Sequence, residues 1–328
     1  MPVEGTDLKV FKAVVNDDTA SNGGAMSAVE AVNGAADIWP AVDLAERTAG
    51  STRYRKTFHK NDNADDTALQ NTVVGVSKPT PGGDSLYLIA ADQINTQGDL
   101  VGTEDRYGAG QLNAPAGIGD SSIDVLVEDG AVILFRAGER IRINNMTGPD
   151  DGVNTQEFHT INGAPTVLGD VVTIAITGTL ANAYGTADTA VSSVIEAGTV
   201  AAMVSVPVVT SAAGVVDEAL LGLHNVGGVQ ETWTLTFTSA LNYDLVGSTL
   251  GAIGSGSISS DYAPINPDTA TPYLTLTAAF FTGTWLTGDT VVFATSPAAV
   301  PTFEERVVPA GTASSSGNLR DVFMWGES

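Results

Sequence analysis

The feature that most constrains the fold of this chain is the alternation of apolar and polar side chains at every second position. It is clearest in residues 231–238, where Trp233, Leu235 and Phe237 alternate with threonines. Successive side chains of a β-strand point to opposite faces, so such a segment buries one face and leaves the other exposed. No segment shows a sustained apolar period of about 3.6 residues, which a surface helix requires. The sequence therefore predicts an all-β protein with little helix.

Turn signals divide the chain into three β modules. Residues 1–112 are expected to form an N-terminal β domain, with strands at 8–15, 53–60, 72–76 and 85–90. Residues 26–32 fit either a short helix or a strand. Residues 79–83 contain two prolines and two glycines, which cannot continue a ladder, so they predict a hairpin-like connection.

The second module, residues 113–200, has five or six short alternating or apolar segments about ten residues apart. That spacing is typical of a small β-barrel or sandwich. The apolar run 132–135 is one of these segments; in another, Ile141 and Ile143 face away from Arg140 and Arg142. Residues 201–328 form an acidic β-sandwich. The second module is expected to be inserted between the other two, and whether the third packs on the first is left open.

Charge is distributed very unevenly along the chain. The formal net charge is −24, and residues 143–328 hold 17 acidic side chains against two arginines, Arg306 and Arg320. Such a surface repels nucleic acid and anionic membranes, so neither is an expected partner. Two explanations of the charge remain open. It keeps an abundant protein soluble, or it meets a cationic partner surface or divalent cations.

Other functional classes are excluded by what the sequence lacks. There are no cysteines, which excludes disulfides, thiolate catalysis and cysteine-ligated metals. No apolar stretch approaches the roughly 18 residues of a membrane helix, and the first residues lack the pattern of a signal peptide. We therefore expect a protein made in the cytoplasm and not secreted.

No constellation of residues predicts catalysis or a cofactor. His59, His159 and His224 lie far apart in the sequence, without the spacing of metal ligands. Adjacent acidic pairs such as Glu304-Glu305 point to opposite faces in a strand, so they suit solvated turns better than a glycosidase site. The acidic loops 61–66 and 149–152 resemble calcium-binding loops in composition only. A Gly-x-Ser-x-Gly elbow between strand and helix and a phosphate-binding loop are also absent. The prediction is that the chain is not an enzyme.

One strongly basic segment remains, and we predict that it makes an assembly contact with the acidic half of a neighbouring copy. A plain solvated face is the second interpretation. Nucleic-acid binding, with Tyr54 and Phe58 stacking on bases, is the third. The residues of this basic cluster are Arg47, Arg53, Arg55, Lys56 and Lys60.

Residues 46–61 resemble a segment of virion structural proteins from tailed bacteriophages. Those proteins carry an Ala-Gly-x-x-x-Tyr-Arg-Lys-x-Phe-x-Lys-Asn run at the start of a β-sandwich, and residues 49–61 reproduce it. Residues 289–309, with Trp285 before them, look similar to the C-terminal part of the same proteins. Residues 123–157 are similar to small β modules inserted in phage tail and fibre components. The resemblance is structural and carries over no catalytic residue.

This resemblance implies a structural protein of the virion, above all of the tail or baseplate, that acts by protein–protein assembly. Its expected partners are other copies of itself, as a homo-oligomer, and other virion proteins. Neck or collar rings and capsid-decorating proteins are the nearest alternatives. A major capsid protein is disfavoured because no long spine helix is visible.

Two alternatives come from other functional classes. A carbohydrate- or receptor-binding adhesin module would expose clustered aromatics, for which Trp285, Phe280 and Phe281 are the candidates, although a buried role suits them better. A polysaccharide-degrading enzyme would need a convergent carboxylate pair that the sequence does not offer. The C-terminal residues 324–328 fit either docking into another subunit or a frayed end.

Overall fold

The computed structural model of the chain describes residues 2–32, 37–145, 155–315, 318 and 320–328. In these ranges it contains 26 strands and a single α-helix, α1 (Leu44–Ala49), which confirms the prediction of an all-β protein. No helix in the described ranges is long and apolar enough to cross a membrane. The short 3-10 turns are η1 (Gly5–Asp7), η2 (Gln97–Asp99), η3 (Glu218–Leu220) and η4 (Ala278–Phe280).

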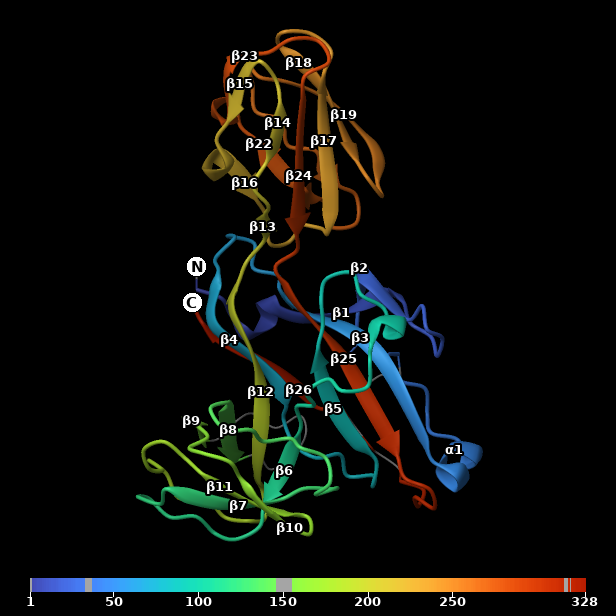
Figure 1. Cartoon of the computed structure of the whole chain (residues 1–328), viewed down its shortest axis with the longest axis vertical. Coiled ribbons are helices and arrows are strands. Elements are labelled where there is room, and N and C mark those ends of the chain that lie inside the picture. The colour runs from blue at the N-terminus through green and yellow to red at the C-terminus, as the bar shows by residue number, and fades with distance from the viewer. Residues whose placement is uncertain (1, 33–36, 146–154, 316–317, 319) are drawn as a thin grey trace.

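A five-stranded antiparallel sheet occupies the middle of the molecule, in the order β2-β1-β3-β25-β5 (Figure 1). Its centre is the pairing of β3 with β25, which come from opposite ends of the chain and run in register over ten residue pairs. Lys56, Phe58 and Lys60 share one face of β3, while Arg55, Thr57 and His59 share the other. The strands are β1 (Leu8–Val15), β2 (Gly23–Glu30), β3 (Ser51–Asn61), β5 (Ser85–Ala90) and β25 (Ala299–Val308).

A nine-stranded sheet continues below it, in the order β10-β11-β7-β6-β12-β4-β26, with β8 paired to β12 and β9 to β8. Its alternating inner residues, such as Ile123, Ile141, Ile143 and Ile174, fill one hydrophobic core. An isolated bridge between residues 161 and 176 joins β9 to β11, but no ladder of strands closes a barrel in the described residues. The strands are β4 (Leu69–Val76), β6 (Ala109–Leu112), β7 (Ser122–Leu126), β8 (Arg140–Asn145), β9 (Thr155–Thr160), β10 (Thr166–Leu168), β11 (Val171–Ala175), β12 (Thr189–Val200) and β26 (Val322–Glu327).

The strands from β13 to β24 form a separate module at the top of Figure 1, joined to the rest through β12–β13 and β24–β25. Trp233, Leu235 and Phe237 lie in its core with almost no exposed surface, which confirms the alternation expected for residues 231–238. The strands are β13 (Met203–Val204), β14 (Val208–Thr210), β15 (Ala213–Val216), β16 (Leu221–Leu223), β17 (Glu231–Phe237), β18 (Asn242–Gly247), β19 (Gly251–Ser257), β20 (Ile265–Asn266), β21 (Thr271–Pro272), β22 (Leu274–Leu276), β23 (Phe281–Thr284) and β24 (Thr290–Ser296).

The sheets do not follow the boundaries expected at residues 112 and 200. β25 and β26 lie in the region 201–328, yet they pair with β3, β5 and β4 of the region 1–112. β4 in turn pairs with β12 of the region 113–200. The upper module, from β13 to β24, is therefore inserted in the chain between β12 of the nine-stranded sheet and β25 of the five-stranded sheet.

Two local predictions need correction. Residues 79–83 do not close a hairpin, because β4 and β5 belong to different sheets and the connection carries the chain from one to the other. The apolar run 132–135 is not a strand. Leu134 and Phe135 are buried in the core beneath the nine-stranded sheet while the backbone around them is irregular.

Hydrogen bonds fix the upper module on the middle sheet. The Asp66 carboxylate lies 2.9 Å from Nδ1 of His224 and accepts the backbone N–H of Asn225 at 2.7 Å. Lys60 donates from Nζ to the backbone oxygen of Val226 at 2.8 Å. These contacts join the end of β3 and the loop after it to the loop between β16 and β17.

Candidate functional site

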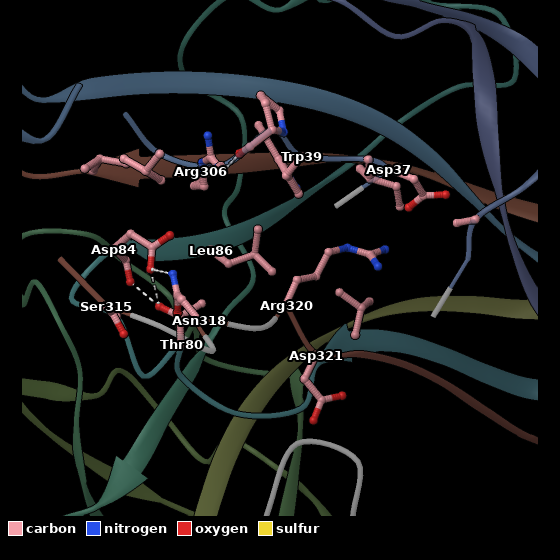
Figure 2. Close-up of a pocket in the computed structure, with 18 of the residues that line it drawn as sticks. Asp37, Trp39, Thr80, Asp84, Leu86, Arg306, Ser315, Asn318, Arg320 and Asp321 are labelled. Carbon is pink, nitrogen blue, oxygen red and sulfur yellow. Dashed lines mark hydrogen bonds between the residues drawn. The ribbon is translucent and has the colours of Figure 1, made fainter. Parts of the chain in front are cut away.

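A pocket of about 770 Å³ lies beside the middle sheet (Figure 2). Its lining includes residues of β25, residues 37–42, and residues 312–315, 318, 320 and 321. Its lining mixes charged and polar side chains with Trp39 and Leu86. In Figure 2, Arg306 and Trp39 lie along one side, Arg320 reaches across the opening, and Asp84 is hydrogen-bonded to Asn318 at 2.7 Å.

Two arginines from neighbouring strands contact the ring of Trp39. The guanidinium of Arg55 on β3 lies 5.0 Å from its ring centroid and that of Arg306 on β25 lies 4.6 Å away. Both distances fall within the range of a cation–π contact. Pro40 keeps Trp39 out of the helical region, so the chain here is extended, and the indole is buried against the sheet.

Glu304 is the centre of the polar cluster beneath this pocket, and its side chain is fully buried. Arg320 donates to both of its oxygens, at 2.6 and 2.5 Å. Trp39 Nε1 and Thr57 Oγ1 donate to the same carboxylate, each at 2.9 Å. Burial acts to raise the pKa of Glu304, but the charge of Arg320 and these hydrogen bonds outweigh it and lower the pKa.

A carboxylate held by four donors is unsuited to acid–base or nucleophilic chemistry, because its lone pairs are occupied and its proton affinity is low. What the cluster does is connect the chain. It joins β3, β25, the segment around Trp39 and the segment before β26. Glu304 therefore ties the last part of the chain to the middle sheet.

His59 lies next to this cluster on β3, with Nε2 3.1 Å from Oγ1 of Thr302. Burial and the charge of Arg320 lower the pKa of His59 to about 4, while the charge of Glu304 acts in the opposite direction. His59 is therefore neutral near pH 7, and only 1% of its surface is exposed.

The predicted assembly contact needs correction, because three of its five residues are inside the molecule. Arg55, Lys56 and Lys60 are 4%, 1% and 1% exposed. Arg55 donates to Asp18 at 2.6 Å and Lys60 to Asp62 at 2.6 Å.

Lys56 is held by the backbone oxygens of Gly24 and Asn95, each 2.8 Å from its Nζ, and burial lowers its pKa to about 8. Arg55 and Lys60 are ion-paired and Lys56 is hydrogen-bonded within the chain, so these three side chains are not presented to a neighbouring subunit.

The other two residues of the cluster remain partly exposed. Arg53 contacts Glu46 at 2.8 Å and Asp18 at 3.0 Å. Arg47 lines the pocket, and its backbone oxygen accepts the N–H of Gly311. Of the five predicted residues, three are therefore buried, Arg53 forms partly exposed ion pairs, and Arg47 lines the pocket.

The prediction of solvated turns is wrong for one acidic pair. Glu304 and Glu305 are 0% and 2% exposed on β25 and, as expected of neighbours in a strand, point to opposite faces. Glu304 binds Arg320, whereas Glu305 binds Arg106 and accepts the hydroxyl of Tyr54 at 2.8 Å. Tyr54 thus has a hydrogen-bond partner within its own chain.

The remaining candidates for chemistry stay separate. His159 pairs with Glu157 at 2.8 Å in the nine-stranded sheet, whereas His59 lies in the middle sheet and His224 in the upper module. Residues 149–152 lie outside the described part of the chain. In the described part, no three His, Asp or Glu side chains are placed to hold one metal ion.

The aromatics considered for an adhesin are buried. Trp285, Phe280 and Phe281 are 1%, 0% and 7% exposed, and Trp285 stacks on Phe237 with ring centroids 4.3 Å apart. The buried role expected for them is confirmed, and they offer no platform for a sugar ring.

Sequence reasoning did not predict that Trp39, Glu304 and Arg320 form one cluster. One signal was present, because Arg306 and Arg320 are the only arginines, with no lysine, in the acidic stretch of residues 143–328. Isolated cations in such surroundings are expected to find carboxylates within the chain. Comparison with known proteins gives no further guide: no family model, no curated protein and no solved structure matches the chain.

Proposed function

We propose that this chain is a structural subunit of a tailed-phage virion, in the tail or baseplate, that acts by assembling with copies of itself and with other virion proteins. The observation that carries the proposal is the pairing of β3 with β25. The two segments that resemble phage virion proteins, residues 46–61 and 289–309, contain these strands, which lie side by side over ten residue pairs. The resemblance therefore concerns one element of structure and not two unrelated stretches.

Exposed apolar side chains on a free sheet edge also support an assembly role. Leu168 is 83% exposed on β10, the outermost strand at one end of the nine-stranded sheet. It lies opposite Val171, which lies opposite Leu126, itself 44% exposed. An unpaired edge with an apolar row beside it is a surface to which other strands add readily.

Self-association is expected to strengthen as salt is added, because Arg55, Lys56 and Lys60 are buried and bound within their own chain, and the copies repel one another at a net charge of −24. Raising the ionic strength from about 0.01 M to about 0.15 M shortens the Debye length from about 30 Å to about 8 Å and so screens this repulsion.

Light scattering of the purified chain across a salt series measures the effect, and the average mass should rise with salt. A mass that falls as salt is added would show that opposite charges hold the copies together. A monomer at every salt and protein concentration would contradict self-assembly.

A further inference from the structure

The six-stranded sheet of the upper module has one face in the core of that module and one face outside it. Its strands lie in the order β13-β24-β17-β18-β19, with β14 also paired to β24 (Figure 1). Side chains alternate along each strand, so Thr232, Thr234 and Thr236 of β17 point away from the core that Trp233 and Leu235 enter. The outward side chains of these six strands together form the outer face of the upper module.

The outer face is nearly free of charge. From Met203 to Ser296, where the structure describes every residue, the chain has seven acidic residues and no lysine or arginine. Asp244 is the only one of the seven on the outer face, and Ser255 donates to its carboxylate at 2.6 Å. Glu231 points inward and is 2% exposed, and the other five lie outside the strands of the sheet. In a chain with a net charge of −24, this face is therefore a surface where two copies can approach with little repulsion.

An apolar row crosses the outer face at right angles to the strands. Val208 lies opposite Val292, Val292 opposite Thr234, and Thr234 opposite Val246. Val246 in turn lies opposite Ala252. Val208 and Val246 are 65% and 39% exposed. Valine and threonine are branched at Cβ and form an even surface on a sheet, which suits the packing of one sheet face on another.

We propose that the outer face binds the same face of a second copy, about a two-fold axis that runs along the apolar row. This inference rests on the proposed self-assembly and names one of its contacts. Each residue of the row then meets its own counterpart, so that Val246 packs on Val246 and Thr234 on Thr234. Such a contact needs no opposite charges, and the upper module has no cation to supply them.

The two-fold arrangement also keeps the carboxylates of the two copies apart. Asp244 lies opposite Thr236, in the outward pair next to Thr234 and Val246, and therefore on one side of the apolar row. A rotation about the row carries Asp244 of the second copy to the other side of it. The contact therefore brings no two like charges directly together, which would oppose association.

The size of the outer face predicts a weak contact. Five strands side by side, about 4.8 Å apart, and seven residues of about 3.4 Å each give a face roughly 20 Å wide and 20 Å long. Two such faces cover about 800 Å² in total, which is less than the roughly 1,200–2,000 Å² of stable interfaces. The dimer is therefore expected to form reversibly, with an average mass that depends on the protein concentration.

Thr234→Glu tests the contact at its centre. Thr234 is half-buried on the outward side of β17, and glutamates at this position in the two copies would face each other across the axis. Dimerisation should weaken by about tenfold or more, because the contact then brings two like charges together. The matched control is Thr282→Glu on β23, which adds the same charge to a strand outside this sheet. Sedimentation equilibrium over a range of protein concentrations, in salt that screens the net charge, measures the association constants of both variants and of the unchanged chain.

Single cysteines give a second test that leaves the charge unchanged, because the chain has no cysteine of its own. Val246→Cys places one thiol of each copy beside the two-fold axis. A thiol-reactive cross-linker that spans facing sheets about 10 Å apart should then link the two copies. The control is Val215→Cys on β15, outside this sheet, where the valine is 57% exposed. The linked dimer should be several times more abundant for Val246→Cys than for the control.

Three results would overturn this contact. One is cross-linking of Val246→Cys no stronger than that of Val215→Cys, in samples that sedimentation shows to be associated. Another is a folded Thr234→Glu variant that associates as strongly as Thr282→Glu. In both cases the copies meet elsewhere, and the proposed self-assembly stands. The third is an unchanged chain that stays monomeric at every salt and protein concentration, which would contradict the proposed self-assembly as well.

Discussion

Replacing Glu304 with glutamine is expected to lower the free energy of unfolding by about 3–5 kcal/mol, the usual cost of removing one partner of a buried ion pair. The substitution keeps the shape of the side chain but removes its charge. Arg320 then loses its carboxylate partner, and Trp39 and Thr57 lose a charged acceptor. Denaturant unfolding at pH 7, with the slope compared between variants, measures the loss.

Glu196→Gln is the matched control, because Glu196 is an exposed carboxylate in the strand β12. It should change the stability by less than about 0.5 kcal/mol. If Glu304→Gln changes the free energy of unfolding by no more than this control does, the polar cluster does not hold the last part of the chain on the middle sheet.

Stability is expected to fall as the pH is lowered from about 6.5 towards 4, through the protonation of His59. Its pKa is lowered in the folded state to about 4 from an ordinary value of 6.5. Between these values the unfolded chain binds the proton and the folded chain does not, so acid favours unfolding. The contribution of His59 is complete above pH 6.5 and is lost on approaching pH 4, by about 3 kcal/mol.

His59→Gln isolates this contribution, because glutamine does not titrate and can still bond to Thr302. The groups that face His59 are Thr302, Glu304 and Arg320, and all three are unchanged in the variant. Unfolding free energies measured at steps from pH 7 to pH 4 should decline less steeply in the variant. Parallel curves would show that His59 is not the group responsible.

The strands of this fold could be predicted from the sequence because alternation is a local property. Residues 231–237 bury Trp233, Leu235 and Phe237 as their pattern indicates, and Leu8–Val15 forms β1 with the expected bounds. The partners of these strands could not be predicted in the same way. β3 pairs with β25 from the far end of the chain, and only the tertiary fold brings them together.

The basic cluster shows the same limit at the level of single side chains. Lysine and arginine crowded on one short element normally lie on a surface, which is why a contact face was expected. Here Lys60 finds Asp62 and Val226, and Arg55 finds Asp18 and the Trp39 ring, after the chain has folded around them. The ion pair of Glu304 and Arg320 could not be predicted, because the sequence does not show that the fold brings Arg320 next to this carboxylate of β25.

The central claim is that this chain is built into a tailed-phage particle, and the protein content of purified particles tests it most directly. Tailed particles from a host that produces the chain would be separated on a density gradient and analysed by quantitative mass spectrometry before and after the tails are detached. The account predicts the chain in intact particles at many copies, and in the detached tail fraction. A chain abundant in the lysate but missing from the particles would contradict it.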